Sequence, residues 1–276
     1  MAILFENVFF SYDGKNDVLK NININIEDNS FIGLIGKSGS GKTTFVQQMN
    51  ALLKPTKGKV LIDGIDTTAK KVKELREKVG MVFQYPEHQL FEETVYKDIA
   101  FGLRKKNLSD EEKRERVSKV IKRVGLEEDI LERSPFELSG GQKRRVAIAG
   151  VLVMEPQILI LDEPSAGLDP DGKKNIYDFL YRLWQEKDIT IILISHNMED
   201  IAKYTEKAIV MEEGEIKLFE VRDKIFRDKK ILKNSGLDIP VATKLMEKIK
   251  KSIPEISDEI YTVDEAVEEI SKKLRG

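Results

Sequence analysis

The sequence predicts an α/β protein in which helices cover a largely parallel sheet. Short apolar segments alternate with helical segments through the second half of the chain. A glycine-rich turn joins the apolar segment FIGLI to a helix, and the apolar segment ILIL runs directly into Asp162 and Glu163. Because parallel sheets present their ligand sites at the carboxyl ends of the strands, these two features indicate one functional edge.

The first part of the chain is predicted to form strands at ILFENVFFSY, at LKNININIE with its strict alternation, and at FIGLIG. A helix is expected over 42–53, followed by the strand KVLIDG. A charged surface helix is expected over 70–79, and GMVFQ is a short buried strand. Residues 85–135 are mostly helical, with N-caps at Thr94 and Ser109.

The remaining elements alternate as helix 139–153, strand 157–162, helix 170–187, strand 189–195 and helix 198–203. The segment AIVMEEGEIKLFE then predicts a hairpin that turns at Glu213–Gly214. We expect one main domain over 1–221, with a helical subdomain at about 85–150. Lys- and Glu-rich amphipathic helices follow in a small module over 222–276.

Composition excludes several classes of protein. The 46 Lys and Arg nearly balance the 48 Asp and Glu, so the net charge of −2 gives no general attraction for nucleic acid or anionic lipid. The absence of Cys removes disulfides, thiolate metal ligands and thiol nucleophiles. No apolar run approaches the roughly 18 residues that span a bilayer, and the N-terminus carries no signal-peptide pattern.

The segment GKSGSGKT fits the pattern of a phosphate-binding loop and stands between a buried strand and a helix. Its backbone N–H groups and the helix N-terminus face the phosphates, Lys42 adds a positive charge, and the Thr43 hydroxyl can bind Mg²⁺. The predicted ATP contacts in this segment are Gly36, Lys37, Ser38, Gly39, Ser40, Gly41, Lys42, Thr43 and Thr44.

Asp162 and Glu163 follow the strand ILIL. Asp162 is expected to hold Mg²⁺, and Glu163 to polarise the water that attacks the γ-phosphate. Taken alone, two acids after a strand could equally be a solvated strand end or a helix cap. The phosphate-binding loop earlier in the chain favours the catalytic interpretation.

The string LSGGQ at 138–142, one helix ahead of LDEP, resembles the signature of ATP-binding cassette proteins. That resemblance implies a P-loop cassette: a parallel-sheet core, an N-terminal antiparallel β-subdomain and a helical subdomain. It also implies that Tyr12 stacks on adenine, that Gln84 senses the nucleotide and its metal, that Asp169 belongs to the loop SAGLDP, and that His196 is the switch histidine. An ordinary strand aromatic and a polar strand end remain the alternatives for Tyr12 and His196.

The signature itself suits a second anion site. Ser139 begins a helix, so its hydroxyl, the amides of Gly140 and Gly141 and the helix dipole would face a γ-phosphate, with Gln142 completing the segment. The family resemblance implies a head-to-tail dimer in which each signature closes on the partner's ATP. One copy alone is then expected to be inactive.

The segments YPEHQLFEETVYKDIAFGL and FELSGGQKRRVAIAGVLVMEP resemble the ATPases of energy-coupling factor transporters, most closely their second type. This implies a peripheral subunit on the cytoplasmic side of the cell membrane that drives uptake of a vitamin or metal ion. The implied partners are a paralogous ATPase, a transmembrane coupling subunit and, indirectly, a substrate-binding membrane component; nucleic acid is not expected. Two departures from these relatives are Lys143, often Met there, and Ser165, commonly Thr.

Two surfaces are expected from the same resemblance. Val95, Ile99 and Leu103 form an apolar stripe that could receive a coupling helix of the membrane subunit or could pack on its own domain. The module at 222–276 would hold two ATPases together. A rival hypothesis, a soluble cassette ATPase acting on ribosomes or DNA, is kept open by a basic face at Lys143, Arg144 and Arg145.

Overall fold

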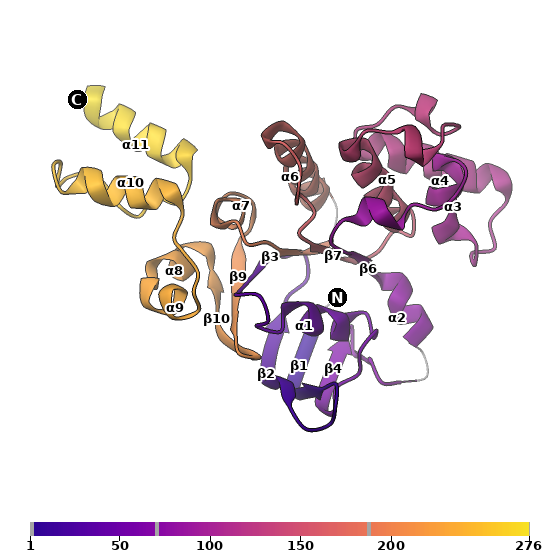
Figure 1. Cartoon of the computed structure of the whole chain (residues 1–276), viewed down its shortest axis with the longest axis horizontal. Helices are drawn as coiled ribbons and strands as arrows, with labels where there is room; N and C mark the ends of the chain where they lie inside the picture. The colour runs from indigo at the N-terminus through magenta and orange to yellow at the C-terminus, as the bar shows by residue number, and fades with distance from the viewer. Residues whose placement is uncertain (1–2, 70–71, 187–188, 276) are drawn as a thin grey trace.

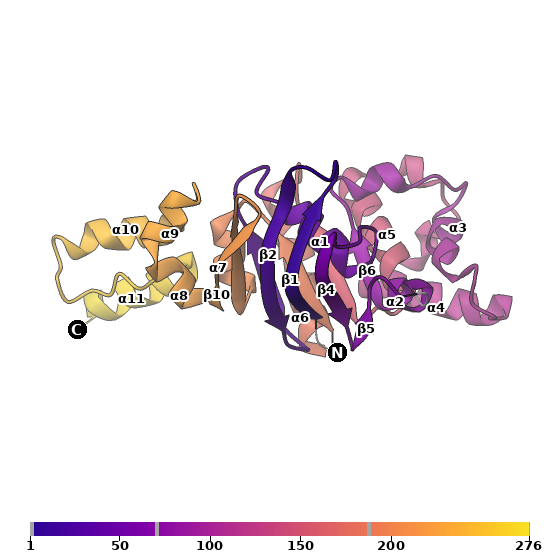
Figure 2. The ribbon, with the colours of Figure 1, turned by 90° about the horizontal axis from the view of Figure 1, so that it is seen from below.

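The computed structural model describes residues 3–69, 72–186 and 189–275. Two sheets lie at the centre, the helices α3, α4 and α5 lie to one side of them, and the C-terminal helices extend from the other side (Figures 1 and 2). The predicted α/β cassette fold is confirmed. None of the helices in these ranges has the length and apolar content needed to cross a bilayer.

The smaller sheet is antiparallel and contains the N-terminal strands in the order β2-β1-β4-β5. Its strands are β1 (Ile3–Ser11), β2 (Asp17–Ile26), β4 (Lys57–Ile62) and β5 (Ile65–Asp66). Ile22 and Ile24 of β2 are buried in alternation, as a period of two predicts, whereas in β1 a register shift separates the buried residues Phe5 and Val8 by three positions. This is the N-terminal β-subdomain that the sequence predicted.

The larger sheet has the order β10-β9-β3-β8-β7-β6. All neighbours from β9 to β6 are parallel, whereas β10 joins the edge antiparallel to β9. Its strands are β3 (Phe31–Ile35), β6 (Val79–Val82), β7 (Ile158–Asp162), β8 (Thr190–Ile194), β9 (Lys207–Glu212) and β10 (Glu215–Val221). The ends of β3, β7 and β8 therefore bring 36–43, Asp162–Glu163 and His196 to one edge.

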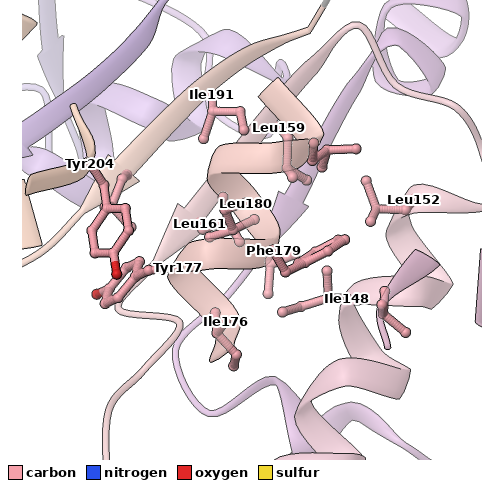
Figure 3. Packing of buried hydrophobic residues seen from close by; sticks show 14 of the residues in the cluster. Ile148, Leu152, Leu159, Leu161, Ile176, Tyr177, Phe179, Leu180, Ile191 and Tyr204 are labelled. Atoms are coloured by element: carbon pink, nitrogen blue, oxygen red, sulfur yellow. The ribbon is translucent and has the colours of Figure 1, made fainter. Parts of the chain in front are cut away.

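The two faces of this sheet belong to two hydrophobic cores. Ile158 and Ile160 face the core that contains α1 (Lys42–Met49) and the antiparallel sheet. Leu159 and Leu161 face the core formed with α5 (Gly140–Leu152), α6 (Pro170–Glu186) and α7 (Met198–Tyr204). Figure 3 shows this second core, in which Ile148, Leu180 and Phe179 surround the strand residues.

The helical region begins after β6 and packs around α5. It contains α3 (Val95–Ala100), α4 (Asp110–Arg123) and short 3-10 turns at Pro86–Gln89, Phe101–Leu103, Glu128–Ile130 and Pro135–Glu137. Both predicted N-caps are confirmed: the Thr94 hydroxyl accepts the Lys97 N–H, and Ser109 forms a capping box with Glu112.

Some boundaries differ from the expected ones. The helix predicted over 42–53 ends at Met49, because Asn50 closes it and Ala51 has a left-handed backbone with φ 53°. The helix expected over 70–79 is α2 (Val72–Lys78), and Val79 already belongs to β6. Residues 70–71 and position 187 of the expected helix 170–187 lie outside the described residues.

The C-terminal segment forms α8 (Arg222–Arg227), α9 (Lys229–Asn234), α10 (Val241–Lys250) and α11 (Val263–Arg275). Helices α8 and α9 pack on the main core through Ile225, Phe226 and Leu232. Helices α10 and α11 instead share a small core of their own, formed by Ala242, Met246, Ile256 and Ala266. They are the part of the chain farthest from α4 (Figure 2).

Candidate nucleotide site

The phosphate loop links β3 to α1 and is supported from behind by the β9–β10 hairpin. Gly36, Lys37, Ser38, Gly39, Ser40 and Gly41 form the loop, and Lys42, Thr43 and Thr44 begin α1. Gly36 has φ 157°, and a Cβ on it would fall 2.3 Å from the Met211 carbonyl oxygen. The Gly214 amide at the hairpin turn donates to the Ser40 carbonyl oxygen at 3.1 Å. The loop conformation therefore depends on contacts about 170 residues away in sequence.

Lys42 is buried and its ammonium group lies within the loop. Its Nζ donates to the carbonyl oxygens of Gly36 at 2.6 Å and Lys37 at 2.9 Å. Burial lowers the pKa of Lys42, and the negative charges of Asp162 and Glu163 oppose that change. Both of these acceptors are neutral carbonyls, so an anionic phosphate oxygen would be a stronger acceptor for this cation.

Tyr12 stands at the end of β1 with 64% of its surface exposed. Its hydroxyl lies 3.1 Å from Thr44 Oγ1, and its ring packs edge-on against Phe10 at a centroid distance of 4.8 Å. The contact with Thr44 holds this exposed aromatic beside the first turn of α1. A planar base can therefore reach the ring while its phosphates lie in the loop.

At the carboxyl edge, the Thr43 hydroxyl donates to Asp162 Oδ2 at 3.4 Å. Burial and then the neighbouring charge of Glu163 raise the pKa of Asp162. A hydroxyl and a carboxylate are the hard oxygen donors that Mg²⁺ prefers, and it takes few protein ligands because phosphates and waters complete its octahedron. Thr43 and Asp162 therefore fit the predicted ion.

Glu163 stands between two of the other predicted site residues. His196 Nε2 lies 2.6 Å from its Oε1, and Gln84 Nε2 donates to its Oε2 at 3.1 Å. Its backbone has φ 48°, and its N–H donates to the Ile194 carbonyl oxygen at 3.0 Å. The ends of β6, β7 and β8 thus bring Gln84, Glu163 and His196 into one hydrogen-bonded group.

The signature segment forms the start of α5. Ser139 is the N-cap, and its hydroxyl oxygen accepts the Gln142 N–H at 3.3 Å while Gln142 Oε1 accepts the Ser139 N–H at 3.0 Å. Apart from neighbouring residues and the helix's own backbone, no atom of the described residues lies within 4 Å of where a Cβ on Gly140 or Gly141 would be. Asp169 caps α6 by accepting the Gly172 N–H at 2.7 Å. The signature is therefore an open helix N-terminus whose hydroxyl hydrogen is free to turn outward.

Arg144 corrects the basic face expected from the sequence. It is 2% exposed, and its guanidinium makes a bidentate pair with Glu87, with Nη2–Oε1 2.6 Å and Nε–Oε2 3.1 Å. Its Nη1 also donates to the carbonyl oxygens of Pro164 and Ala166 at 3.2 and 2.6 Å. Arg144 therefore joins the signature helix to the loop after β7, a role that the sequence did not predict.

Of the two alternatives for the apolar stripe, the structure supports packing on its own domain rather than docking of a membrane subunit. Val95, Ile99 and Leu103 are fully buried in the core of the helical region, so their apolar face packs on their own domain. A groove of about 870 Å³ lies beside them instead. Phe91 and Phe101, exposed and edge-on at 5.0 Å, line it together with Val151, Met154 and several Lys and Arg side chains. An aromatic groove lined by more basic than acidic side chains therefore lies next to the buried stripe.

Comparisons with known proteins agree with this geometry. The ABC transporter family model matches residues 19–166. The energy-coupling factor transporter ATP-binding protein EcfA2 of Acetivibrio thermocellus is 54% identical over 93% of this chain and 92% of its own length. EcfA2 of Caldanaerobacter subterraneus subsp. tengcongensis is 50% identical over 100% of this chain and 99% of its own length.

Solved structures give the same result. CbiO1 of Clostridium perfringens, described as part of the transporter complex CbiONQ, has a TM-score of 0.77 and 40% identity, covering 89% of this chain and 98% of that one. The cassette MJ0796, solved as a post-hydrolysis dimer with ADP and Pi, has a TM-score of 0.71 and 32% identity, covering 80% and 98%. The chain belongs to the ATP-binding cassette family, among the energy-coupling factor transporter ATP-binding proteins.

Proposed function

We propose that this chain hydrolyses ATP as one of two facing cassettes and so drives an energy-coupling factor importer whose membrane-spanning subunits are separate proteins. The observation that carries this proposal is the group formed by Gln84, Glu163 and His196 at the same sheet edge as the phosphate loop. A nucleotide held by that loop has its γ-phosphate directed toward this edge, where a carboxylate is available to receive a proton.

Each residue has a distinct part in that reaction. Glu163 accepts a proton from the attacking water, and His196 and Gln84 fix the orientation of its carboxylate. Lys42 transfers its hydrogen bonds from the two loop carbonyls to phosphate oxygens. Thr43 and Asp162 would hold Mg²⁺, which when bound neutralises charge on the β- and γ-phosphates. Gln84 stands at the same edge and is proposed to respond to both the bound nucleotide and its Mg²⁺.

The second cassette supplies the other half of the site. The open N-terminus of α5, with Ser139, Gly140 and Gly141, suits the γ-phosphate bound by a partner. Asp169, which caps the start of α6, is proposed to face the same partner. We expect the partner ATPase to be a paralogue, because the relatives carry the name of one member of a numbered pair. Fully active complexes built from two copies of this chain would overturn that expectation.

Tyr12→Ala is expected to raise the dissociation constant for ATP about 5- to 150-fold, because stacking of a base on an aromatic ring contributes about 1–3 kcal/mol. Tyr12→Phe keeps the ring and loses only the hydroxyl contact with Thr44, so its affinity should stay within about threefold. Titration calorimetry on both variants measures the difference. Equal losses for Ala and Phe would assign the effect to the hydroxyl and remove the stacking role.

The groove beside α3 suits a cytoplasmic helix of the membrane subunit. Its exposed rings offer apolar contact, and its Lys73, Arg76, Arg104, Lys105 and Lys106 outnumber Glu77 and Asp98. Phe101→Asp is expected to weaken recovery of the membrane subunit by more than about tenfold, since it places a charge where an aromatic anchor packs. Leu52→Asp, at an exposed apolar position outside the groove, is the matched control. Equal recovery with both variants would contradict this location.

The C-terminal module over 222–276 is proposed to hold the two ATPases together. Its helices α10 and α11 expose Val241, Leu245, Val263, Val267 and Leu274. Such a row of apolar side chains next to a small separate core is suited to association with another protein surface. Sedimentation of the chain with and without 222–276 tests this, and an unchanged dimer constant would contradict it.

The proposed cellular place is the cytoplasmic face of the cell membrane, as a peripheral subunit, and the proposed cargo is a vitamin or metal ion bound by a separate membrane component. A tagged pull-down from detergent-solubilised membranes, with ATPase assay of the eluate, tests the function. We expect a second cassette ATPase and an integral membrane protein, with activity. Recovery of ribosomal proteins or nucleic acid instead would overturn the transport function and leave the ATP chemistry intact.

A further inference from the structure

Tyr177 is a buried polar residue for which the ATPase reaction described above has no use. It lies on α6 and is only 1% exposed, among the largest fully buried side chains. Its ring stacks on Tyr204 at a centroid distance of 5.1 Å, and Figure 3 shows the two side by side at the edge of the apolar cluster. An apolar side chain would fill this space, so the hydroxyl calls for a separate explanation.

The Tyr177 hydroxyl meets both loops that flank the catalytic edge. It lies 2.9 Å from Ser165 Oγ, and Ser165 is two residues after Glu163. Ser195, which immediately precedes His196 and accepts the Asn197 N–H at 3.1 Å, also interacts with this hydroxyl. One phenol oxygen therefore links the segment after β7 to the segment after β8.

The third neighbour is Asp200 on α7, whose carboxylate interacts with the phenol and pairs with Lys173 at 3.0 Å. A neutral phenol donates one hydrogen bond and accepts two. Burial raises the pKa of Tyr177, which keeps the phenol neutral. A neutral phenol in this position can donate to the ionised carboxylate while it accepts from a serine hydroxyl. The segment after β7, the segment after β8 and α7 therefore meet at this one hydroxyl.

We propose that Tyr177 is a positioning residue for ATP hydrolysis, which fixes the distance between Glu163 and His196 by joining the loops on which they stand. The two residues touch at 2.6 Å on the ligand side, and the Ser165–Tyr177–Ser195 bridge holds the same two loops from the core side. Ser165 supplies the hydroxyl at one end of this bridge. This proposal rests on the proposed function, because it assigns Tyr177 to the same reaction.

Tyr177→Phe removes the bridging oxygen and keeps the ring. In the assembled complex, we expect kcat for ATP hydrolysis to fall about three- to tenfold with the KM for ATP within about twofold, because one to two hydrogen bonds that order the catalytic pair are lost. Tyr204→Phe is the matched control: it makes the same change in the stacked neighbour, whose hydroxyl donates to Asp178 at 2.9 Å and touches neither loop. That variant should retain kcat within about twofold.

A second pair of variants keeps the proposal open to contradiction if Tyr177→Phe folds poorly. Ser165→Ala should lower kcat as Tyr177→Phe does, and the double variant should be no slower than either single variant. Ser165→Thr keeps a hydroxyl at this position and should therefore hydrolyse ATP at the parental rate. Additive losses, equal losses for Tyr177→Phe and Tyr204→Phe, or an unchanged kcat would overturn the proposal. A parent complex without ATPase activity would instead contradict the proposed function.

Discussion

Glu163→Gln is expected to lower kcat for ATP hydrolysis by about 10²- to 10⁴-fold, the usual contribution of a general base. The amide keeps the size of the side chain but cannot accept a proton from water. ATP affinity should stay within about threefold, because the loop and Lys42 are unchanged. Hydrolysis is also the step expected to separate the two cassettes, so the variant should accumulate as an ATP-bound closed dimer.

Single-turnover hydrolysis, ATP titration and size-exclusion chromatography with ATP or ADP measure the three quantities. Glu115→Gln makes the same substitution at an exposed position of α4 and should behave as the parent. Hydrolysis by Glu163→Gln near the parental rate would remove Glu163 from its proposed role. Loss of ATP binding would show that the carboxylate supports the loop instead.

Arg144→Ala is expected to lower the free energy of unfolding by about 3–5 kcal/mol, the usual result of removing one partner from a buried ion pair. The substitution leaves Glu87 without its bidentate partner and the carbonyl oxygens of Pro164 and Ala166 without a donor. The total stability of a typical domain is about 5–15 kcal/mol. Destabilisation on this scale should therefore be visible as poor expression or early melting.

Denaturant unfolding measures this loss, and Arg145→Ala is the matched control. Arg145 makes one hydrogen bond, at 3.0 Å to the Gly125 carbonyl oxygen, at a more exposed position, so about 1 kcal/mol is expected. Adding Glu87→Gln to Arg144→Ala should recover part of the loss, since the unpaired charge is removed. If Arg144→Ala and Arg145→Ala lower the free energy of unfolding equally, the Arg144–Glu87 pair adds little to stability.

The pKa of Glu87 predicts how the contribution of this ion pair to the free energy of unfolding depends on pH. Burial acts to raise the pKa of Glu87, but the hydrogen bonds and charge of Arg144 outweigh it and hold that pKa below its ordinary value. Because the folded-state pKa is depressed, the stabilisation is present above the ordinary pKa of glutamate. It is lost as the pH falls through the folded-state value. Arg144→Ala should therefore flatten the acid side of the stability profile.

Much of the site was predictable because its residues stand at strand ends. Parallel strands place their carboxyl ends together, so FIGLI before the loop, ILIL before Asp162 and ILIS before His196 were enough to predict which side chains meet. Local caps at Thr94 and Ser109 were predictable for the same kind of reason, since each depends on residues three positions away. Short-range sequence patterns and the shared edge of parallel strand ends are therefore enough to predict these site residues and N-caps.

The features that could not be predicted depend on which distant segment packs against a given helix face. Val95, Ile99 and Leu103 have the period of an apolar helix face, but periodicity does not tell whether α5 or another protein packs against it. Arg144 is one of three consecutive basic residues, and only the partner Glu87, 57 positions earlier, makes it a buried residue. The sequence likewise predicts an ordinary core position for Tyr177, because only the fold places Ser165 and Ser195 near its hydroxyl.

The hairpin that supports the phosphate loop has a practical consequence. A turn such as Glu213–Gly214, with φ of 49° and 83°, is the kind of surface position usually chosen for a fluorescent label or an inserted tag. Here the Gly214 amide donates to Ser40, and its carbonyl oxygen accepts the Lys20 N–H at 2.8 Å. An insertion at this turn would therefore disturb the nucleotide pocket, and a label or tag on this ATPase needs another attachment point.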